Sequence, residues 1–148
     1  MEKMLNLIRS LSLLLFLSAC GTPNVVNYPV TIDKEFVPYI EQYRLDKFRF
    51  TQSSTNEITA IFRSSPDSSY IGTCFIGYGT RWIEIDPSSW FNMTDSEKYI
   101  LMLHEMGHCD LNLDHTPDIS IMNEYLLSDW QFDQDREFYL KKLFLEGK

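Results

Sequence analysis

The residues best suited to chemistry form an H-E-x-x-H motif at His104, Glu105 and His108, within an apolar stretch, and His115 lies seven residues beyond it. On an α-helix, positions four apart lie about one turn from each other on nearly the same face. The imidazoles of His104 and His108 can therefore bind one metal ion. Glu105 lies beside the first histidine, where its carboxylate can act as general base toward a metal-bound water. The spacing predicts a catalytic zinc site.

The motif requires a helix, and the residues before it supply a start signal. Thr94 and Glu97 fit a capping box, in which each side chain accepts a hydrogen bond from the other residue's backbone N–H. We therefore expect a helix from Asp95 to Leu111. Gly107 lies inside it, where glycine costs about 1 kcal/mol relative to alanine, so its presence indicates close approach of a strand or of the metal shell.

The remaining pattern predicts an α+β fold, because several strands occur with an early, a central and a final helix and without βαβ alternation. Asp33 and Asp133 are expected to be N-caps of the first and last helices. The last two strands are expected to form a hairpin. The expected elements are a helix at Asp33–Asp46, strands at Phe48–Thr51, Glu57–Phe62, Tyr70–Ile76 and Arg81–Asp86, the central helix, and a helix at Asp133–Phe144.

The N-terminus reads as a secretory signal over residues 1–19, with Lys3 and Arg9 before and beside a short apolar run. Residues 17–20 resemble the bacterial lipobox, which implies that Cys20 is lipidated after cleavage. Residues 20–32 then form a lipid-anchored tether and residues 33–148 the catalytic domain. The resemblance implies a place in the bacterial cell envelope. In a bacterium with two membranes, Gly21 implies the outer membrane, with the domain facing the periplasm or the cell surface.

The net charge limits the classes of binding partner, and the two remaining cysteines indicate a disulfide. The chain has a formal net charge of −8, which becomes about −9 once the signal is removed. Nucleic acid is therefore excluded as a partner, because its phosphates would be repelled. In an oxidising compartment a cysteine pair is more often a disulfide than a metal site, so we expect Cys74 and Cys109 to be linked.

The zinc motif and the segment after it resemble the metzincin peptidases, in particular the matrixins. The metzincin pattern is H-E-x-x-H-x-x-G-x-x-H, and a methionine turn lies beyond it. Here Leu111 stands where the glycine is expected, and His115 comes one residue late. Asn112 can replace that glycine one position further on, because asparagine tolerates left-handed backbone geometry. Met122 resembles the methionine of the Met-turn.

The resemblance implies a small zincin-like domain with a mixed, twisted sheet, an active-site helix and a C-terminal helix. It implies zinc held by His104, His108 and His115, with a peptide or protein substrate held by the edge strand Tyr70–Ile76. Two other third ligands remain open. Asp114 lies where the metzincin ligand falls without an insertion, and Glu124 belongs to a segment similar to the N-E-x-x-S-D of thermolysin-like enzymes.

The predicted function is peptide-bond hydrolysis by a zinc-bound water, with Glu105 as general base and the membrane as partner through the lipid anchor. The alternative is a non-catalytic envelope lipoprotein whose helix binds zinc for structural reasons. Glu105 favours the enzyme, because a structural site has no use for a base and normally closes with a fourth protein ligand.

Overall fold

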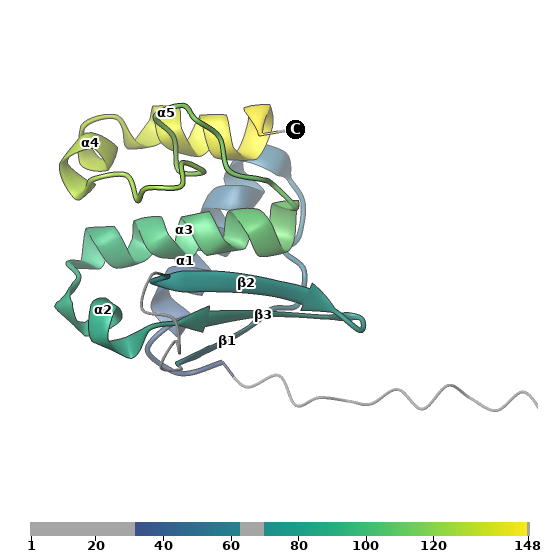
Figure 1. The fold of residues 1–148 in the computed structure, drawn as a ribbon. Coiled ribbons are helices and arrows are strands. Elements are labelled where there is room, and N and C mark those ends of the chain that lie inside the picture. Colours follow the sequence, from purple (N-terminus) through teal and green to yellow (C-terminus); the bar gives the residue numbers. More distant parts are fainter. Residues whose placement is uncertain (1–31, 63–69, 148) are drawn as a thin grey trace, which may run out of the picture.

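One long helix lies at the centre of an α+β fold in the computed structural model, which describes residues 32–62 and 70–147 (Figure 1). The predicted signal peptide, Cys20 and residues 20–31 of the predicted tether lie outside the described residues. No helix in the described ranges is long and apolar enough to cross a membrane. The elements in chain order are α1 (Val37–Thr51), β1 (Thr59–Phe62), β2 (Gly72–Gly77), β3 (Thr80–Ile85), α2 (Pro87–Asn92), α3 (Asp95–Leu111), α4 (Asp129–Gln134), α5 (Arg136–Lys141) and a π-helical turn, η1 (Lys142–Glu146).

The sheet has the order β1-β3-β2, with β2 antiparallel and β1 parallel to β3. The predicted hairpin is confirmed. It turns at Tyr78 and Gly79, whose φ angles are 51° and 77°. Two successive positive φ angles give the two-residue turn whose twist matches that of paired strands. The sheet is mixed, as expected, and β2 forms one edge of it among the described strands.

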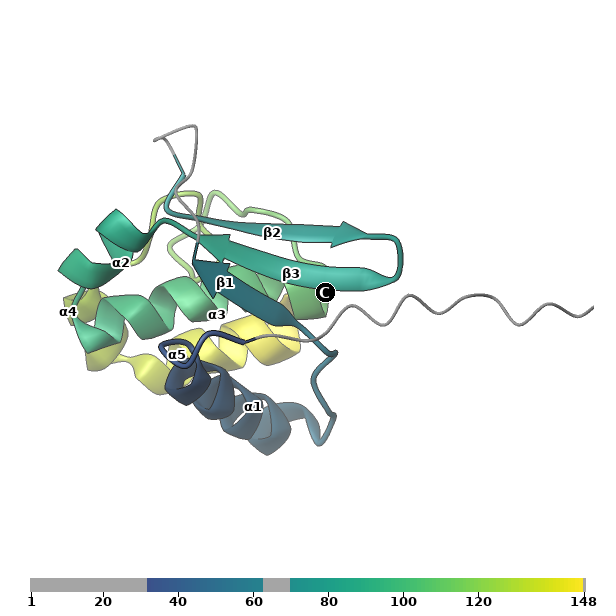
Figure 2. The ribbon, with the colours of Figure 1, turned by 90° about the horizontal axis from the view of Figure 1, so that it is seen from below.

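The central helix α3 has the bounds that its cap predicted. The Thr94 hydroxyl accepts from the Glu97 backbone N–H at 3.2 Å, and the Glu97 carboxylate accepts from the Thr94 N–H at 2.8 Å. In Figure 1 the sheet lies below α3, while α4 and α5 lie above it; Figure 2 shows α1 running alongside. Covered in this way, α3 is buried at almost every residue from Tyr99 to Asp110.

The first helix starts and ends later than predicted. Phe36 occupies the N-cap position without a side-chain hydrogen bond. Asp33 is therefore not the cap; its carboxylate accepts from the Glu35 N–H at 3.1 Å instead. The helix continues to Thr51, so the predicted strand Phe48–Thr51 is wrong.

Contacts with distant residues hold the last turns of α1 in helical form. The Lys47 ammonium donates to the Asp110 carboxylate of α3 at 2.7 Å, and both side chains are buried. The Tyr43 hydroxyl donates to the same carboxylate at 2.7 Å. Phe50 stacks on Phe144 at the other end of the chain, with ring centroids 5.8 Å apart. These partners override the β-branched and aromatic composition that suggested a strand.

The C-terminal region is two helices where one was predicted. Ser128 caps α4 by accepting from the Gln131 N–H at 3.3 Å. Asp133 lies inside that helix, so its predicted role as a cap is wrong. The helical conformation is interrupted at Asp135, where φ is −142°. The helices α5 and η1 then continue to Glu146. Phe132, three residues before this interruption, is 1% exposed and packs into the core.

A short helix, α2, was not predicted. Its signal is nevertheless local, because Asp86 accepts from the Ser88 and Ser89 backbone N–H groups and Pro87 occupies the first helical position. The helix buries Trp90 against Phe36, with ring centroids 4.9 Å apart. In the chain, α2 connects strand β3 to the start of α3.

Candidate metal centre

Three histidine side chains meet at the C-terminal half of α3. The Nε2 atoms of His104 and His108, one helical turn apart, are separated by 3.1 Å. His115 approaches from the segment after the helix, with its Nε2 atom 3.2 Å from that of His104 and 3.1 Å from that of His108. The three residues lie close enough to bind one metal ion.

Backbone carbonyls orient the two helical imidazoles. His104 Nδ1 lies 2.7 Å from the Ile121 carbonyl oxygen, and His108 Nδ1 lies 2.6 Å from that of Leu113. A carbonyl only accepts, so each Nδ1 carries the proton and each Nε2 presents a lone pair to the centre. Burial lowers the pKa of His104 to about 4 and lowers that of His108, so both rings stay neutral at pH 7. Two lone pairs in contact favour a cation between them.

The spacing of the three nitrogens suits a tetrahedral ion. Nitrogen ligands at about 2.0–2.1 Å from such an ion lie about 3.3–3.4 Å apart. The observed separations of 3.1–3.2 Å need an adjustment of only a few tenths of an ångström. All three histidines also line the cavity described below, so an ion held by them would be accessible from that cavity. Imidazole ligands suit zinc, copper, iron and nickel.

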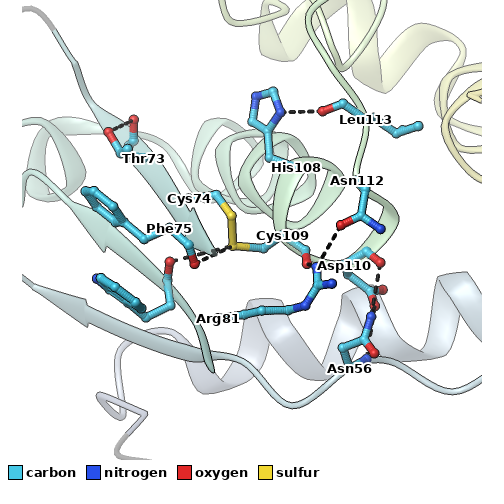
Figure 3. Close-up of a disulfide and its surroundings, with 12 residues drawn as sticks. Asn56, Thr73, Cys74, Phe75, Arg81, His108, Cys109, Asp110, Asn112 and Leu113 are labelled. Atoms are coloured by element: carbon cyan, nitrogen blue, oxygen red, sulfur yellow. Dashed lines mark hydrogen bonds between the residues drawn. A yellow bond between two sulfur atoms is a disulfide. The ribbon is translucent and has the colours of Figure 1, made fainter. Parts of the chain in front are cut away.

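The turn that brings His115 back depends on Asn112. Its φ is 54°, the left-handed conformation expected for it, and it caps the C-terminus of α3. Arg81 of β3 donates to the Cys109 carbonyl and, at 2.9 Å, to the Asn112 side-chain oxygen (Figure 3). Arg81 thus stabilises the turn that carries the Leu113 carbonyl and His115. Nothing in the local motif indicated this role for Arg81, because it depends on β3 lying beside the end of the helix.

A disulfide links the edge strand β2 to α3. Cys74 of β2 and Cys109 of α3, the pair expected from the sequence, are bonded with a Cα–Cα distance of 5.5 Å (Figure 3). Cys109 directly follows His108. The wall formed by β2 is therefore covalently fixed to the helix that supplies two of the three histidines.

Met122 lies under the helix between the two histidines. It is 4% exposed, and a Cβ atom added to Gly107 would lie only 2.3 Å from its sulfur. The close approach expected at Gly107 therefore comes from Met122 rather than from a strand. The preceding carbonyl, that of Ile121, is the one that orients His104. The segment predicted as a Met-turn thus contacts α3 at two points.

Glu105 has a carboxylate that the rest of the described chain leaves unsatisfied. The residue is 3% exposed, and its Oε2 atom has no hydrogen-bond partner among the described residues. Burial raises its pKa to about 8. Gly72 of β2 lies so close that an added Cβ atom would be 2.4 Å from Glu105 Oε1. A glycine there leaves room for the carboxylate beside the strand.

The histidines and Glu105 line a cavity of about 900 Å³. One wall is β2 with Tyr70 and Ile71, and the other is the segment after α3. Asp114 and Glu124, the alternative third ligands, also line the cavity, but neither joins the group of ligand atoms that the three histidines form. His115 therefore has the better geometry for the third ligand.

A comparison of the chain with models of known protein families, with curated proteins and with solved structures finds no match.

Proposed function

We propose that the chain is a zinc-dependent peptidase of metzincin-like architecture. The observation that carries the proposal is that Glu105, whose buried Oε2 atom has no partner among the described residues, lines the same cavity as the three histidines. A structural zinc site normally has four protein ligands and no adjacent base. Three candidate ligands with a carboxylate beside them, and no fourth protein ligand among the described residues, support the arrangement that metal-assisted hydrolysis needs.

The roles of the residues follow from their positions. His104, His108 and His115 would hold the ion, and the Ile121 and Leu113 carbonyls keep the first two rings oriented toward it. Zinc, when bound, polarises the scissile carbonyl and makes water acidic near neutral pH. Glu105 takes the water's proton on Oε2 and passes it to the leaving amine. Its burial keeps competing water away from that atom.

The edge strand β2 would hold the substrate. Its one described neighbour is β3, so the backbone groups on its other side are available to an extended peptide. A peptide added there would extend the sheet. Gly72 places the backbone of β2 directly against the Glu105 carboxylate, which would bring the scissile bond and the base together.

The test compares the wild-type protein with Glu105→Gln. We expect the wild type to cleave peptides in a broad library, to lose cleavage with a zinc chelator and to regain it with added zinc. Glu105→Gln keeps the shape but removes the base, so hydrolysis should fall at least about 10²-fold while zinc content stays at wild-type level. His115→Ala should weaken zinc binding far more than Asp114→Ala.

Absence of any cleavage by the zinc-loaded wild type, or equal cleavage by Glu105→Gln, would contradict the proposal. The non-catalytic lipoprotein would then be the better explanation. A reversed order of the two zinc-binding variants would move the third ligand to Asp114.

We also propose that the protein is anchored in the bacterial envelope by lipid on Cys20. The support is the sequence Leu17-Ser18-Ala19-Cys20 after a short apolar run. Cys20→Ala should abolish metabolic lipid labelling and release the protein from the membrane fraction. Unchanged fractionation of this variant would refute the anchor.

A further inference from the structure

Negative charge dominates the lining of the metal-site cavity. Besides Glu105, four acidic residues line it, and no lysine or arginine among the described residues does. A divalent cation held by neutral imidazoles brings two positive charges, fewer than these carboxylates supply. The four residues are Glu84, Asp86, Asp114 and Glu124.

Two of these carboxylates are free to bind a ligand. Asp86 already caps α2, and Glu84 accepts from the Trp82 indole N–H at 3.1 Å. Asp114 and Glu124 are exposed, and neither makes a hydrogen bond or an ion pair with another described residue. Both lie on the segment after α3, the same segment that carries His115.

Aromatic rings accompany the free carboxylates on the cavity wall. Tyr125, next to Glu124, is 79% exposed, and Tyr70, before β2, is 63% exposed. Exposed rings beside carboxylates suit the long side chains of lysine and arginine, whose stems pack on apolar surface and whose cationic ends are attracted to ring faces. Glu105 also lines the cavity, and its buried Oε2 atom has no hydrogen-bond partner among the described residues, so a polar ligand would find an unsatisfied group beside this wall.

We propose that this cavity selects cationic peptides, with Asp114 and Glu124 binding lysine or arginine side chains close to the scissile bond. This inference rests on the proposed peptidase function. The chain as a whole carries a formal charge of −8, so its field also attracts such substrates before contact. Acidic peptides would meet unpaired carboxylates on entry and be rejected.

The experiment uses three peptides that differ only in the residues flanking the cleaved bond, which are lysine, glutamine or glutamate. For wild-type zinc-loaded protein we expect kcat/KM to fall in that order. Exposed ion pairs are weak, so each carboxylate should contribute about threefold to the preference for lysine over glutamine. Asp114→Asn and Glu124→Gln should each reduce that ratio, and together should reduce it about tenfold. The preference should also shrink as salt is raised from about 0.05 to 0.5 M.

Glu35→Gln is the matched control, because it removes the same charge from an exposed residue outside the cavity lining. It should leave the ratio unchanged. An equal fall in all three variants would assign the preference to net charge and overturn the role of the cavity.

Direct binding separates the failure of this inference from the failure of the peptidase. The affinity of zinc-loaded Glu105→Gln for the same peptides is measured by calorimetry. Preferential binding of the lysine peptide, lost in the Asp114 and Glu124 variants, would support a cationic-ligand site even if no peptide were cut. Cleavage or binding that ignores charge would overturn the inference and leave the peptidase standing. No binding and no cleavage of any peptide would overturn both.

Discussion

Gly72→Ala tests whether catalysis depends on the close contact between β2 and the Glu105 carboxylate. The added Cβ atom would lie 2.4 Å from Glu105 Oε1, 2.9 Å from Cδ and 3.0 Å from Cγ. Non-bonded carbon contacts are best at about 3.5–4.0 Å, so the carboxylate must retreat by roughly 1 Å. A misplacement of that size near the reacting atoms can cost about 10²-fold in rate. We therefore expect kcat/KM for a cleaved peptide to fall about 100-fold.

Stability and zinc content should change much less. Crowding of a packed interior costs about 1–3 kcal/mol, while replacing glycine by alanine in a strand returns about 0.5–1 kcal/mol. The net loss in the free energy of unfolding should be at most about 2.5 kcal/mol, measured by urea denaturation. The three atoms nearest to the new methyl group all belong to Glu105, so zinc stoichiometry should stay at the wild-type value.

Gly77→Ala is the matched control on the same strand, since an added Cβ atom there meets nothing within 4 Å. It should keep wild-type activity and raise the free energy of unfolding by about 0.5–1 kcal/mol. Activity of Gly72→Ala within about threefold of wild type would refute the close coupling of strand and base. A parallel loss in both variants would assign the effect to the strand in general.

Three further outcomes are expected from the metal centre. Asn112→Val should weaken zinc affinity at least about tenfold, because a branched side chain is strained at a φ of 54°, whereas Asn112→Gly should stay within about threefold; equal losses in competitive zinc titrations would contradict this role of the turn. Replacing Cys74 and Cys109 by serine opens a link across 35 residues and should lower the free energy of unfolding by about 3–4 kcal/mol; denaturation curves that coincide with wild type would rule this out. In zinc-free Glu105→Gln, the free energy of unfolding should rise by up to about 3 kcal/mol from pH 4 to pH 6.5, because the lowered pKa of His104, about 4, makes the unfolded chain bind the proton first. In the wild type the raised pKa of Glu105, about 8, acts in the opposite direction between pH 4.5 and pH 8, so a flatter profile is expected there.

The central helix and its histidines could be predicted because their signals are local. Thr94 and Glu97 are three residues apart and cap each other, while His104 and His108 need only the helical repeat to meet. The approach of His115 to the other two histidines could also be predicted from the sequence. It depends on one residue, Asn112, which tolerates left-handed backbone geometry. Short-range rules therefore identified the three histidines that the structure brings together.

Features that depend on distant partners were missed. The last turns of α1 are helical because Lys47 and Phe50 meet Asp110 and Phe144, which lie 63 and 94 residues further along the chain. Arg81 acts on the end of α3 from a different element. Such partners leave no pattern near the residues they stabilise, so the aromatic and β-branched residues of Phe48–Thr51 suggested a strand where the chain is helical.

The disulfide between Cys74 and Cys109 also affects the entropy cost of binding a ligand in the cavity. An edge strand that hangs free loses conformational entropy when a peptide pairs with it, and that loss weakens binding. Here the strand is already ordered at its centre by a covalent link to α3. The cavity between β2 and α3 is therefore preorganised. Most of the entropy cost of ordering the strand is met during folding and disulfide formation rather than at each binding event.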